Sequence, residues 1–307
     1  MRIALIGQAA FGKSVLDAIV NGGKDTVVGV FCPPDKPGAQ SDPVKTSALA
    51  SNVPCYQFKR MRSPEAIEQF RALQADLCVM AFVTDIVPQE ILSAPRLGTI
   101  QYHPSLLPKH RGPSSINWPI IFGENETGLT IFWPDAGLDT GPVLLQKRIP
   151  IGPDDTLGTI YFDQLMPMGV AAMVEAVELV RHGKAPKIPQ DESRATYEGW
   201  CTDEHANVDW SKPAQQVHNL IRGCNPRPGA FTTSGGARLR LFDSELRPHE
   251  AGHRPGAIAA ISSAGMEIAA NGGHVLVKRV QLDGGKKIPA AEFAAVAGLQ
   301  QGTLLGS

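Results

Sequence analysis

Blocks of apolar residues alternate with longer amphipathic stretches along the first half of the chain. The apolar blocks, typical of buried strands, lie at residues 2–6, 26–31, 54–58, 77–82 and 98–102. Helical patterns lie between the first four of them, at residues 7–20, 44–51 and 64–73. Strands that alternate with helices are joined by right-handed crossovers and form a mainly parallel sheet. The pattern therefore predicts an α/β fold, a Rossmann-like, doubly wound domain.

This alternation changes beyond residue 128. Two apolar runs, 129–133 and 143–149, are joined by a turn without a helix, which predicts a hairpin added to the sheet. A long helical pattern covers residues 156–182. The polar segment 183–204, with two prolines, is typical of a linker or an extended crossing segment. We therefore predict a domain boundary near residue 204.

Short apolar runs with turn signals between them dominate the rest of the chain. After a helical pattern at residues 213–221, these runs lie at 230–233, 237–242, 256–261, 266–270 and 274–282. Several short strands at such spacing predict a small, OB-like β-barrel. The predicted organisation is a first domain, residues 1–204, and a second domain, residues 205–307.

The composition fits a soluble globular protein. The 307 residues are 43% hydrophobic, and no apolar run approaches the roughly 20 residues that a membrane span needs. We expect a cytoplasmic protein without a membrane partner. A net charge of −1 argues against a protein that lives on nucleic acid. The five cysteines form no C-x-x-C pair, so neither a disulfide framework nor a thiolate zinc site is predicted.

Two polar residues follow apolar runs in a way that is typical of a reactive site. His103 comes directly after the 98–102 run and enters a loop that several prolines and a glycine interrupt. Asp139 lies in the turn after the 129–133 run, where Gly137 and Gly141 bracket it and leave its backbone open to a partner. We interpret His103 and Asp139 as a reacting pair.

Residues 7–14, GQAAFGKS, match a phosphate-binding loop and lie between a predicted strand and a predicted helix. A nucleotide-binding protein that uses Lys13 and Ser14 is therefore an alternative. No apolar strand ends in a clear acidic residue that would hold the magnesium ion of such a site. We favour a tight strand-to-helix turn with Lys13 in solvent.

Residues 249–253 match the H-E-x-x-H zinc pattern. That pattern needs a helix, which puts both histidines on one face. Pro248 and Pro255 flank the motif and Gly252 lies inside it, so a loop is expected instead. His103 and His110 could in principle share a metal, but their proline-rich spacing gives no reason for it. We predict no metal site.

The stretch HPSLLPKHRG, followed by the aspartate of GLDTG, resembles the folate-dependent formyltransferases, a family that includes methionyl-tRNA formyltransferase. Together with MRIALIGQAAFG, VDWSKPAQQVHNLIRG and LVKRVQLDGGKKIPA, it looks most like the amino-terminal hydrolase domain of 10-formyltetrahydrofolate dehydrogenase. The match runs in order over nearly the whole chain. It implies a Rossmann-like formyltransferase domain, then a barrel related to the carboxyl-terminal domain of the tRNA enzyme. The implied formyl donor is 10-formyltetrahydrofolate.

The resemblance also implies roles for individual residues. His103 would stabilise the oxyanion that forms when the formyl carbonyl is attacked, and Asp139 would take the proton from the nucleophile. Gln101 stands where transferases of the family carry asparagine, and its amide sits on an arm one methylene longer. The pterin would lie against Ile86, Val87 and Pro88, a segment whose apolar residues could equally be plain core packing. It would also lie against the turn Asp135, Ala136, Gly137 and Leu138.

The expected activity is an enzyme that transfers the formyl group, most simply to water, giving tetrahydrofolate and formate. Methionyl-tRNA formyltransferase, or another amine N-formyltransferase, is the main alternative. The segment 33–43 that would correspond to the basic loop of the tRNA enzyme has a single lysine, Lys36, which disfavours tRNA as a partner. The chain has no carrier or aldehyde dehydrogenase region, so it works alone or as part of something larger. A folate-binding module without turnover is a further alternative.

Overall fold

The computed structural model describes residues 1–247 and 252–306, and the chain forms two compact units. The first unit consists of Met1–Gly112, Gly128–Arg148 and Gln164–Tyr197. The second consists of Pro113–Thr127, Ile149–Asp163 and Glu198–Ser307. Each unit thus draws on several segments of the chain, while the domain boundary near residue 204 stays a prediction.

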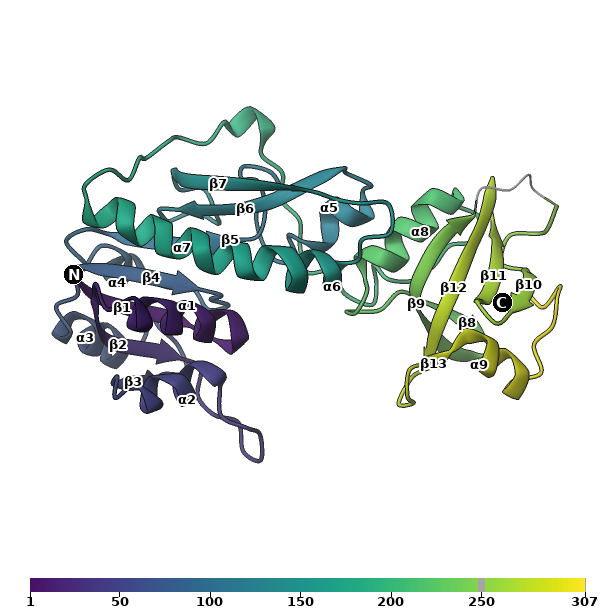
Figure 1. Ribbon diagram of the computed structural model, residues 1–307, viewed down its shortest axis with the longest axis horizontal. Coiled ribbons are helices and arrows are strands. Elements are labelled where there is room, and N and C mark those ends of the chain that lie inside the picture. The colour runs from purple at the N-terminus through teal and green to yellow at the C-terminus, as the bar shows by residue number, and fades with distance from the viewer. Residues whose placement is uncertain (248–251, 307) are drawn as a thin grey trace. The chain divides into compact units, whose positions relative to one another are not determined.

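A seven-stranded sheet forms the first unit, in the order β3-β2-β1-β4-β5-β6-β7 (Figure 1). Its strands are β1 (Arg2–Gly7), β2 (Thr26–Cys32), β3 (Cys55–Gln57), β4 (Leu77–Ala81), β5 (Thr99–His103), β6 (Glu126–Phe132) and β7 (Val143–Pro150). The pairs from β3 to β5 are parallel, and β6 pairs antiparallel with β5. This order confirms the predicted Rossmann-like, mainly parallel sheet.

Helices cover both faces of this sheet: α1 (Ala9–Gly22), α2 (Pro43–Ala50), α3 (Pro64–Ala72), α4 (Gln89–Leu92) and α7 (Met166–Arg181). On one face α1 packs against α7, and the ring of Phe11 lies 4.3 Å from that of Tyr102 on β5. On the other face α3 and α4 bury Phe70 and Ile91 against β1 and β4. Neighbours on a strand point to opposite faces, so His103 and Gln101 lie on the α4 face.

Two of these helices begin as the sequence leads one to expect. Ser63 and Asp42 precede prolines at the start of α3 and α2, and their side chains accept hydrogen bonds from the backbone amides of Ala66 and Val44. The Asp42 carboxylate also accepts from Ala9 N, at 3.0 and 3.1 Å, at the beginning of α1. One carboxylate therefore satisfies the starts of two helices.

The long helix expected at residues 156–182 is interrupted. A short helix, α6 (Leu157–Thr159), leads into a π-helical turn, Ile160–Leu165, before α7 begins. Pro167 lies in the first turn of α7 and has no N–H to donate to the carbonyl four residues earlier. The hydrogen-bonding register changes just before this proline, where an uninterrupted α-helix would require the missing bond.

A six-stranded antiparallel sheet forms the second unit, with β13 paired to the carboxyl-terminal part of β12. Its strands are β8 (Phe231–Ser234), β9 (Ala237–Arg247), β10 (Ile258–Ser262), β11 (Gly265–Ala270), β12 (Gly273–Leu282) and β13 (Ile288–Pro289). Three helices belong to this unit, α5 (Asn117–Ile121), α8 (Ala214–Gly223) and α9 (Ala290–Val296). This confirms the predicted second, small β domain, built on an antiparallel sheet, while its closure into an OB-like barrel stays a prediction.

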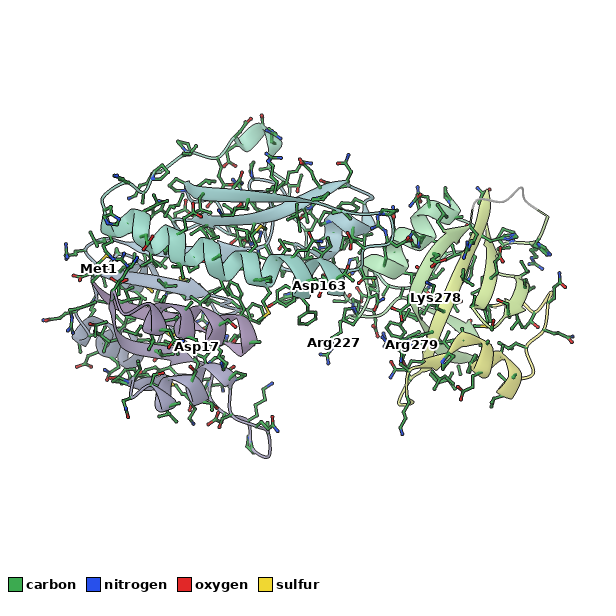
Figure 2. All side chains as sticks on the ribbon, viewed as in Figure 1. Met1, Asp17, Asp163, Arg227, Lys278 and Arg279 are labelled. Atoms are coloured by element: carbon green, nitrogen blue, oxygen red, sulfur yellow. The ribbon has the colours of Figure 1, made fainter. Side chains whose placement is uncertain are left out.

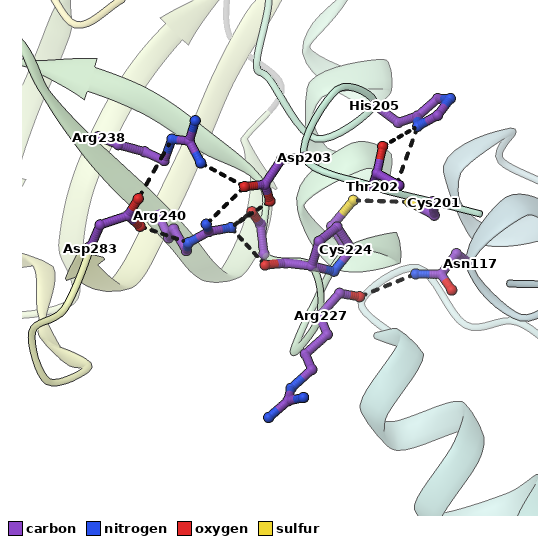
Figure 3. Close-up of polar contacts among 12 residues, drawn as sticks. Asn117, Cys201, Thr202, Asp203, His205, Cys224, Arg227, Arg238, Arg240 and Asp283 are labelled. Carbon is purple, nitrogen blue, oxygen red and sulfur yellow. Dashed lines mark hydrogen bonds and ion pairs between the residues drawn. The ribbon is translucent and has the colours of Figure 1, made fainter. Parts of the chain in front are cut away.

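Polar contacts at the foot of this sheet join its strands to the preceding segment (Figure 3). Asp203 accepts from Arg238 at 2.6 Å and from Arg240 at 3.0 and 3.1 Å. Asp283 accepts from Arg240 at 2.9 Å. Two arginines of β9 and two aspartates therefore form one cluster of charge pairs, and pairs that solvent reaches contribute little stability individually.

His218 on α8 makes the stability of this unit depend on pH. It is 1% exposed; Nε2 donates to Pro153 O at 3.0 Å, and Nδ1 lies 2.9 Å from Ser244 Oγ. Burial lowers the pKa of His218 from the ordinary 6.5. Below pH 6.5, His218 therefore binds a proton in the unfolded chain more readily than in the folded unit. The contribution of His218 to stability is present above that pH and is lost as the pH falls.

We expect the opening free energy of the α8 amides to decline between pH 7.5 and 5.5, with His218 contributing at most ~1.4 kcal/mol per pH unit. Hydrogen exchange measures it. In a His218→Gln variant this decline should be shallower. Equal slopes in the two proteins would contradict the assignment.

No helix in residues 1–247 or 252–306 has both the length and the apolar character to cross a membrane. The cytoplasmic location stays a prediction.

Candidate active site

His103 ends β5 in the interior of the first sheet. It is paired in register with Thr130 of β6 and is 5% exposed. Its Nε2 donates to the backbone carbonyl of His110 at 2.8 Å. Because a carbonyl can only accept, this bond fixes the proton on Nε2 and leaves Nδ1 as the atom that faces the turn.

Asp139 lies opposite that atom. Its Oδ2 is 3.7 Å from His103 Nδ1, and the same oxygen accepts from Gly112 N at 2.8 Å. Asp139 is 9% exposed and has a left-handed backbone with φ of 57°, which aspartate adopts more readily than most residues. The structure thus brings together the two side chains that the sequence singled out, although they are far apart along the chain.

Gln101 lies two residues before His103 on the same strand and opposite Phe132 of β6. Alternation along β5 directs its side chain to the same sheet face as the imidazole. Thr99, again two residues earlier, donates from its hydroxyl to Leu92 O at 2.8 Å, which identifies this face as the one that α4 covers. The place of the Gln101 amide at the reacting centre stays a prediction.

The loop between β4 and α4 contains Ile86, Val87 and Pro88. Ile86 is 72% exposed, whereas Val87 packs partly against the buried cluster beneath α3 and α4. The carboxyl ends of β4 and β5 lie at the same edge of the sheet because these strands are parallel. Ligands of doubly wound sheets bind outside this edge. The loop and His103 therefore share the edge where a ligand is expected.

The second predicted segment, Asp135, Ala136, Gly137 and Leu138, is exposed in the turn before Asp139. Asp135 Oδ1 accepts from Gly137 N at 3.0 Å and from the Thr140 hydroxyl at 2.5 Å, so its carboxylate shapes the turn. Leu138 is 58% exposed. An apolar side chain held in solvent beside a buried acid is available for contact with a flat, partly apolar ligand.

Two residues that sequence reasoning missed support the pair. Arg111 is fully buried, and Gln190 connects its guanidinium to the backbone of the turn that holds Asp139. Neither left a signal in the pattern of apolar residues, because Arg111 follows a polar loop and Gln190 lies in the segment interpreted as a linker. That segment is extended where Ile188 pairs with Val143 and Tyr197 with Arg111, and it forms one turn of 3-10 helix, Glu192–Arg194, between these bridges.

The start of α1 differs from a phosphate-binding loop. The helix begins at Ala9, so residues 9–14 of the motif are helical, and Asp42 already occupies the amide of Ala9. Lys13 pairs at 2.5 Å with Asp17, which is labelled in Figure 2. The negative charge of Asp42 at this helix start would repel a phosphate group. These contacts favour the tight strand-to-helix turn.

Within the described residues, no group of three or more histidine, cysteine, aspartate or glutamate side chains could hold a metal ion. Positions 249–251 of the H-E-x-x-H match lie outside those residues.

All five cysteines are free thiols. Cys201 and Cys224 approach to 3.9 Å between sulfurs (Figure 3), and their hydrogen bond, then burial, raises the pKa of Cys224.

Known sequences match both parts of the chain. Residues 1–177 match the formyl transferase family and residues 201–298 the formyl transferase C-terminal domain. The chain is 44% identical over 310 residues to cytosolic 10-formyltetrahydrofolate dehydrogenase of Mus musculus, covering 95% of this chain and 34% of that protein. It is 38% identical over 309 residues to methionyl-tRNA formyltransferase of Trichlorobacter lovleyi, covering 99% of this chain and 96% of that protein.

Solved structures share the fold. HypX from Aquifex aeolicus in complex with tetrahydrofolic acid superposes with a TM-score of 0.70 at 19% identity, over 98% of this chain and 48% of that one. An N-formyltransferase from Helicobacter canadensis gives 0.68 at 16% identity, over 90% and 98%. At such identities the likeness concerns the fold alone. The chain spans about a third of the length of the dehydrogenases that it matches.

Proposed function

The chain belongs to the formyl transferase family, as its motifs predicted, and on that premise we propose that it removes the formyl group from 10-formyltetrahydrofolate, with water as the simplest acceptor. The products are then tetrahydrofolate and formate. The observation that carries the proposal is the 3.7 Å approach of His103 Nδ1 to Asp139 Oδ2 at the edge of the sheet. The dehydrogenases of the family supply the substrate by name, and HypX was solved with tetrahydrofolic acid.

Asp139 acts on the nucleophile. As water attacks the formyl carbon, the carboxylate accepts one of its protons, which raises the nucleophilicity of the oxygen. A tetrahedral intermediate forms with a negative oxygen. When the carbon–nitrogen bond breaks, Asp139 returns the proton to the departing folate nitrogen. One proton thus moves from water to nitrogen, and the carboxylate ends the cycle as it began.

His103 acts on the oxyanion. Nε2 is held by the His110 carbonyl, so a second N–H at Nδ1 is the donor that would reach the oxyanion. A donor that is fixed before the reaction stabilises the developing charge without reorganising. Gln101, on the same face of β5, would add an amide donor to the same oxygen, in the place of the asparagine of related transferases.

The pterin would lie between the loop of Ile86, Val87 and Pro88 and the turn Asp135, Ala136, Gly137 and Leu138. Two observations support this placement: the β4 loop follows the carboxyl end of a strand next to β5, and Ile86 and Leu138 hold apolar side chains in solvent. Backbone groups in these segments can bind the polar edge of a pteridine while the two side chains contact its faces.

The deciding experiment follows release of tetrahydrofolate and formate from 10-formyltetrahydrofolate by the purified protein. The expected result is release in water alone, with little change when amines or methionyl initiator tRNA are added. Release that depends on an added acceptor, with the formyl group recovered on it, would identify a transferase instead. Binding of the folate without any turnover would identify a folate-binding module.

A methionyl-tRNA formyltransferase is the second candidate, because a relative of that name aligns over nearly the full length of both chains. The charge of the segment 33–43 weighs against it. Lys36 is its one cation, and its Asp35 and Asp42 carry opposite charge. The affinity of a protein for an RNA backbone comes mainly from cationic side chains that neutralise phosphates. Few such contacts are available from this loop.

The phosphate-loop alternative makes a different prediction for Lys13. Lys13→Ala removes an exposed pair with Asp17, and exposed pairs contribute ~0–1 kcal/mol, so formyl release should stay within about twofold of the wild type. A steady-state assay checks this. Loss of activity in this variant would favour a nucleotide-dependent protein.

A further inference from the structure

The side chain of Gln190 joins a buried arginine to the turn that carries Asp139. Its Nε2 donates to the backbone carbonyls of Asp139 at 2.8 Å and Gly141 at 2.7 Å. Its Oε1 accepts from Arg111, at 3.2 Å from Nε and 2.8 Å from Nη2. Both donors of the amide therefore hold the backbone on either side of Thr140. The acceptor oxygen holds the amide itself in place.

The side chain of Arg111 is held rigidly and anchors this contact. Its side chain has no exposed surface, and its guanidinium also donates to the two carboxylate oxygens of Glu192, at 2.9 and 2.6 Å, and to the hydroxyl of Tyr197. Together with the contacts to Gln190, these bonds use every N–H of the planar fork. A guanidinium whose N–H groups are all bonded has one favourable orientation. Its bonds to Oε1 therefore also fix the orientation of the Gln190 amide.

The backbone around Arg111 holds the two reacting side chains. The amide of Arg111 donates to Thr196 O at 3.0 Å, and that of His110 donates to Thr196 Oγ1 at 2.8 Å. The same stretch of backbone contacts both reacting side chains. His110 O accepts from His103, and Gly112 N, directly after Arg111, donates to Asp139. Segment 188–197 therefore supports both members of the pair.

We propose that Gln190 is a positioning residue: its amide keeps the turn around Asp139 in the left-handed conformation that sets the distance from the carboxylate to the His103 imidazole. This inference rests on the proposed function. Gln190 does not touch the reacting atoms in this scheme. It acts through the carbonyls of Asp139 and Gly141, and its removal should slow the chemical step more than it weakens folate binding.

Gln190→Glu is the sharpest test. The carboxylate keeps an oxygen for Arg111, which preserves the attachment of segment 188–197, but the other oxygen replaces the donor and faces two carbonyl oxygens. We expect kcat for formyl release to fall about 10- to 100-fold, the scale of a displacement near 1 Å, while KM for the folate changes about threefold or less. Thermal unfolding verifies that both proteins are folded at the assay temperature.

Ser193→Ala is the matched control. Ser193 lies in the same segment and is exposed, and its hydroxyl donates to Asp191 Oδ1 at 2.6 Å. The kcat of this variant should therefore stay within about twofold of the wild type. A folded Gln190→Glu protein with wild-type kcat overturns the proposal. So does a fall in kcat that is matched by the control, since the segment as a whole would then be responsible.

Nuclear magnetic resonance separates this inference from the proposed activity. The ring nitrogen signals of His103, identified by their absence in His103→Asn, should shift in Gln190→Glu and stay in place in Ser193→Ala. Unchanged signals overturn the inference even if the enzyme is active. A wild-type protein that releases no formyl group with any acceptor overturns the proposed function, while the shift of the His103 signals still decides whether Gln190 positions the pair.

Discussion

Replacing Asp139 with asparagine is expected to lower kcat for formyl release by ~10²–10⁴-fold, the usual contribution of a positioned general base. Asparagine has the same shape, and its oxygen can still accept from Gly112 N, the bond that the carboxylate makes at 2.8 Å. What it loses is the ability to take a proton from water. Steady-state turnover measures the loss, and equilibrium binding of a folate should change little.

Glu175→Gln provides the matched control for this variant. It makes the same carboxylate-to-amide change in the same unit, at an exposed residue of α7 that pairs with Lys147 at 2.6 Å. Its activity should equal that of the wild type. If Asp139→Asn keeps more than about a tenth of the wild-type rate, the carboxylate is not the base that this mechanism requires.

The second large effect is expected for His103→Asn, which should lower kcat by ~10²–10³-fold, the typical result of removing one oxyanion donor. The asparagine amide reaches roughly as far as Nδ1 but cannot also reach His110 O. It therefore lacks the hydrogen bond that fixes the orientation of the His103 ring. We expect KM for the folate to change less than kcat, because the oxyanion exists only after attack has begun. Single-turnover kinetics would isolate this step.

His182→Asn is the corresponding control, since His182 is exposed at the end of α7 and bonds only locally, to Glu178 O at 2.8 Å. It should be fully active. A His103→Asn protein that is folded and has near-normal turnover would remove the imidazole from the mechanism and leave Gln101 as the remaining candidate donor.

The arrangement of the first sheet was predictable because each strand and each helix carries its own periodicity. Runs such as residues 3–6 and 77–81 are continuous and apolar because both faces of the parallel strands are buried. The interruption before α7 was not predicted. Pro167 lies inside an otherwise helical pattern, and apolar periodicity alone does not register a missing N–H.

The pair at the site was predictable for a different reason. His103 and Asp139 each follow an apolar run and enter a loop that glycine or proline interrupts, which is where functional residues are common. Because β6 runs antiparallel to β5, the order of the strands alone does not place the two residues together. Their supports were not predictable, because Gln190 and Arg111 are separated along the chain and act through backbone carbonyls, which carry no sequence signal. A segment rich in polar residues and prolines gives the same composition whether it is a free linker or is bonded along its length.

The burial of Arg111 has a consequence for how the protein fluctuates. Segment 188–197 is short of apolar side chains and faces solvent, as do the regions of proteins that open most easily. Detaching it would break all five hydrogen bonds of the Arg111 guanidinium, to Gln190, Glu192 and Tyr197, and hydrogen bonds to charged groups typically contribute ~1.5–3 kcal/mol each. The outermost stretch of this unit should therefore exchange its bonded amide hydrogens as slowly as parts of the core do.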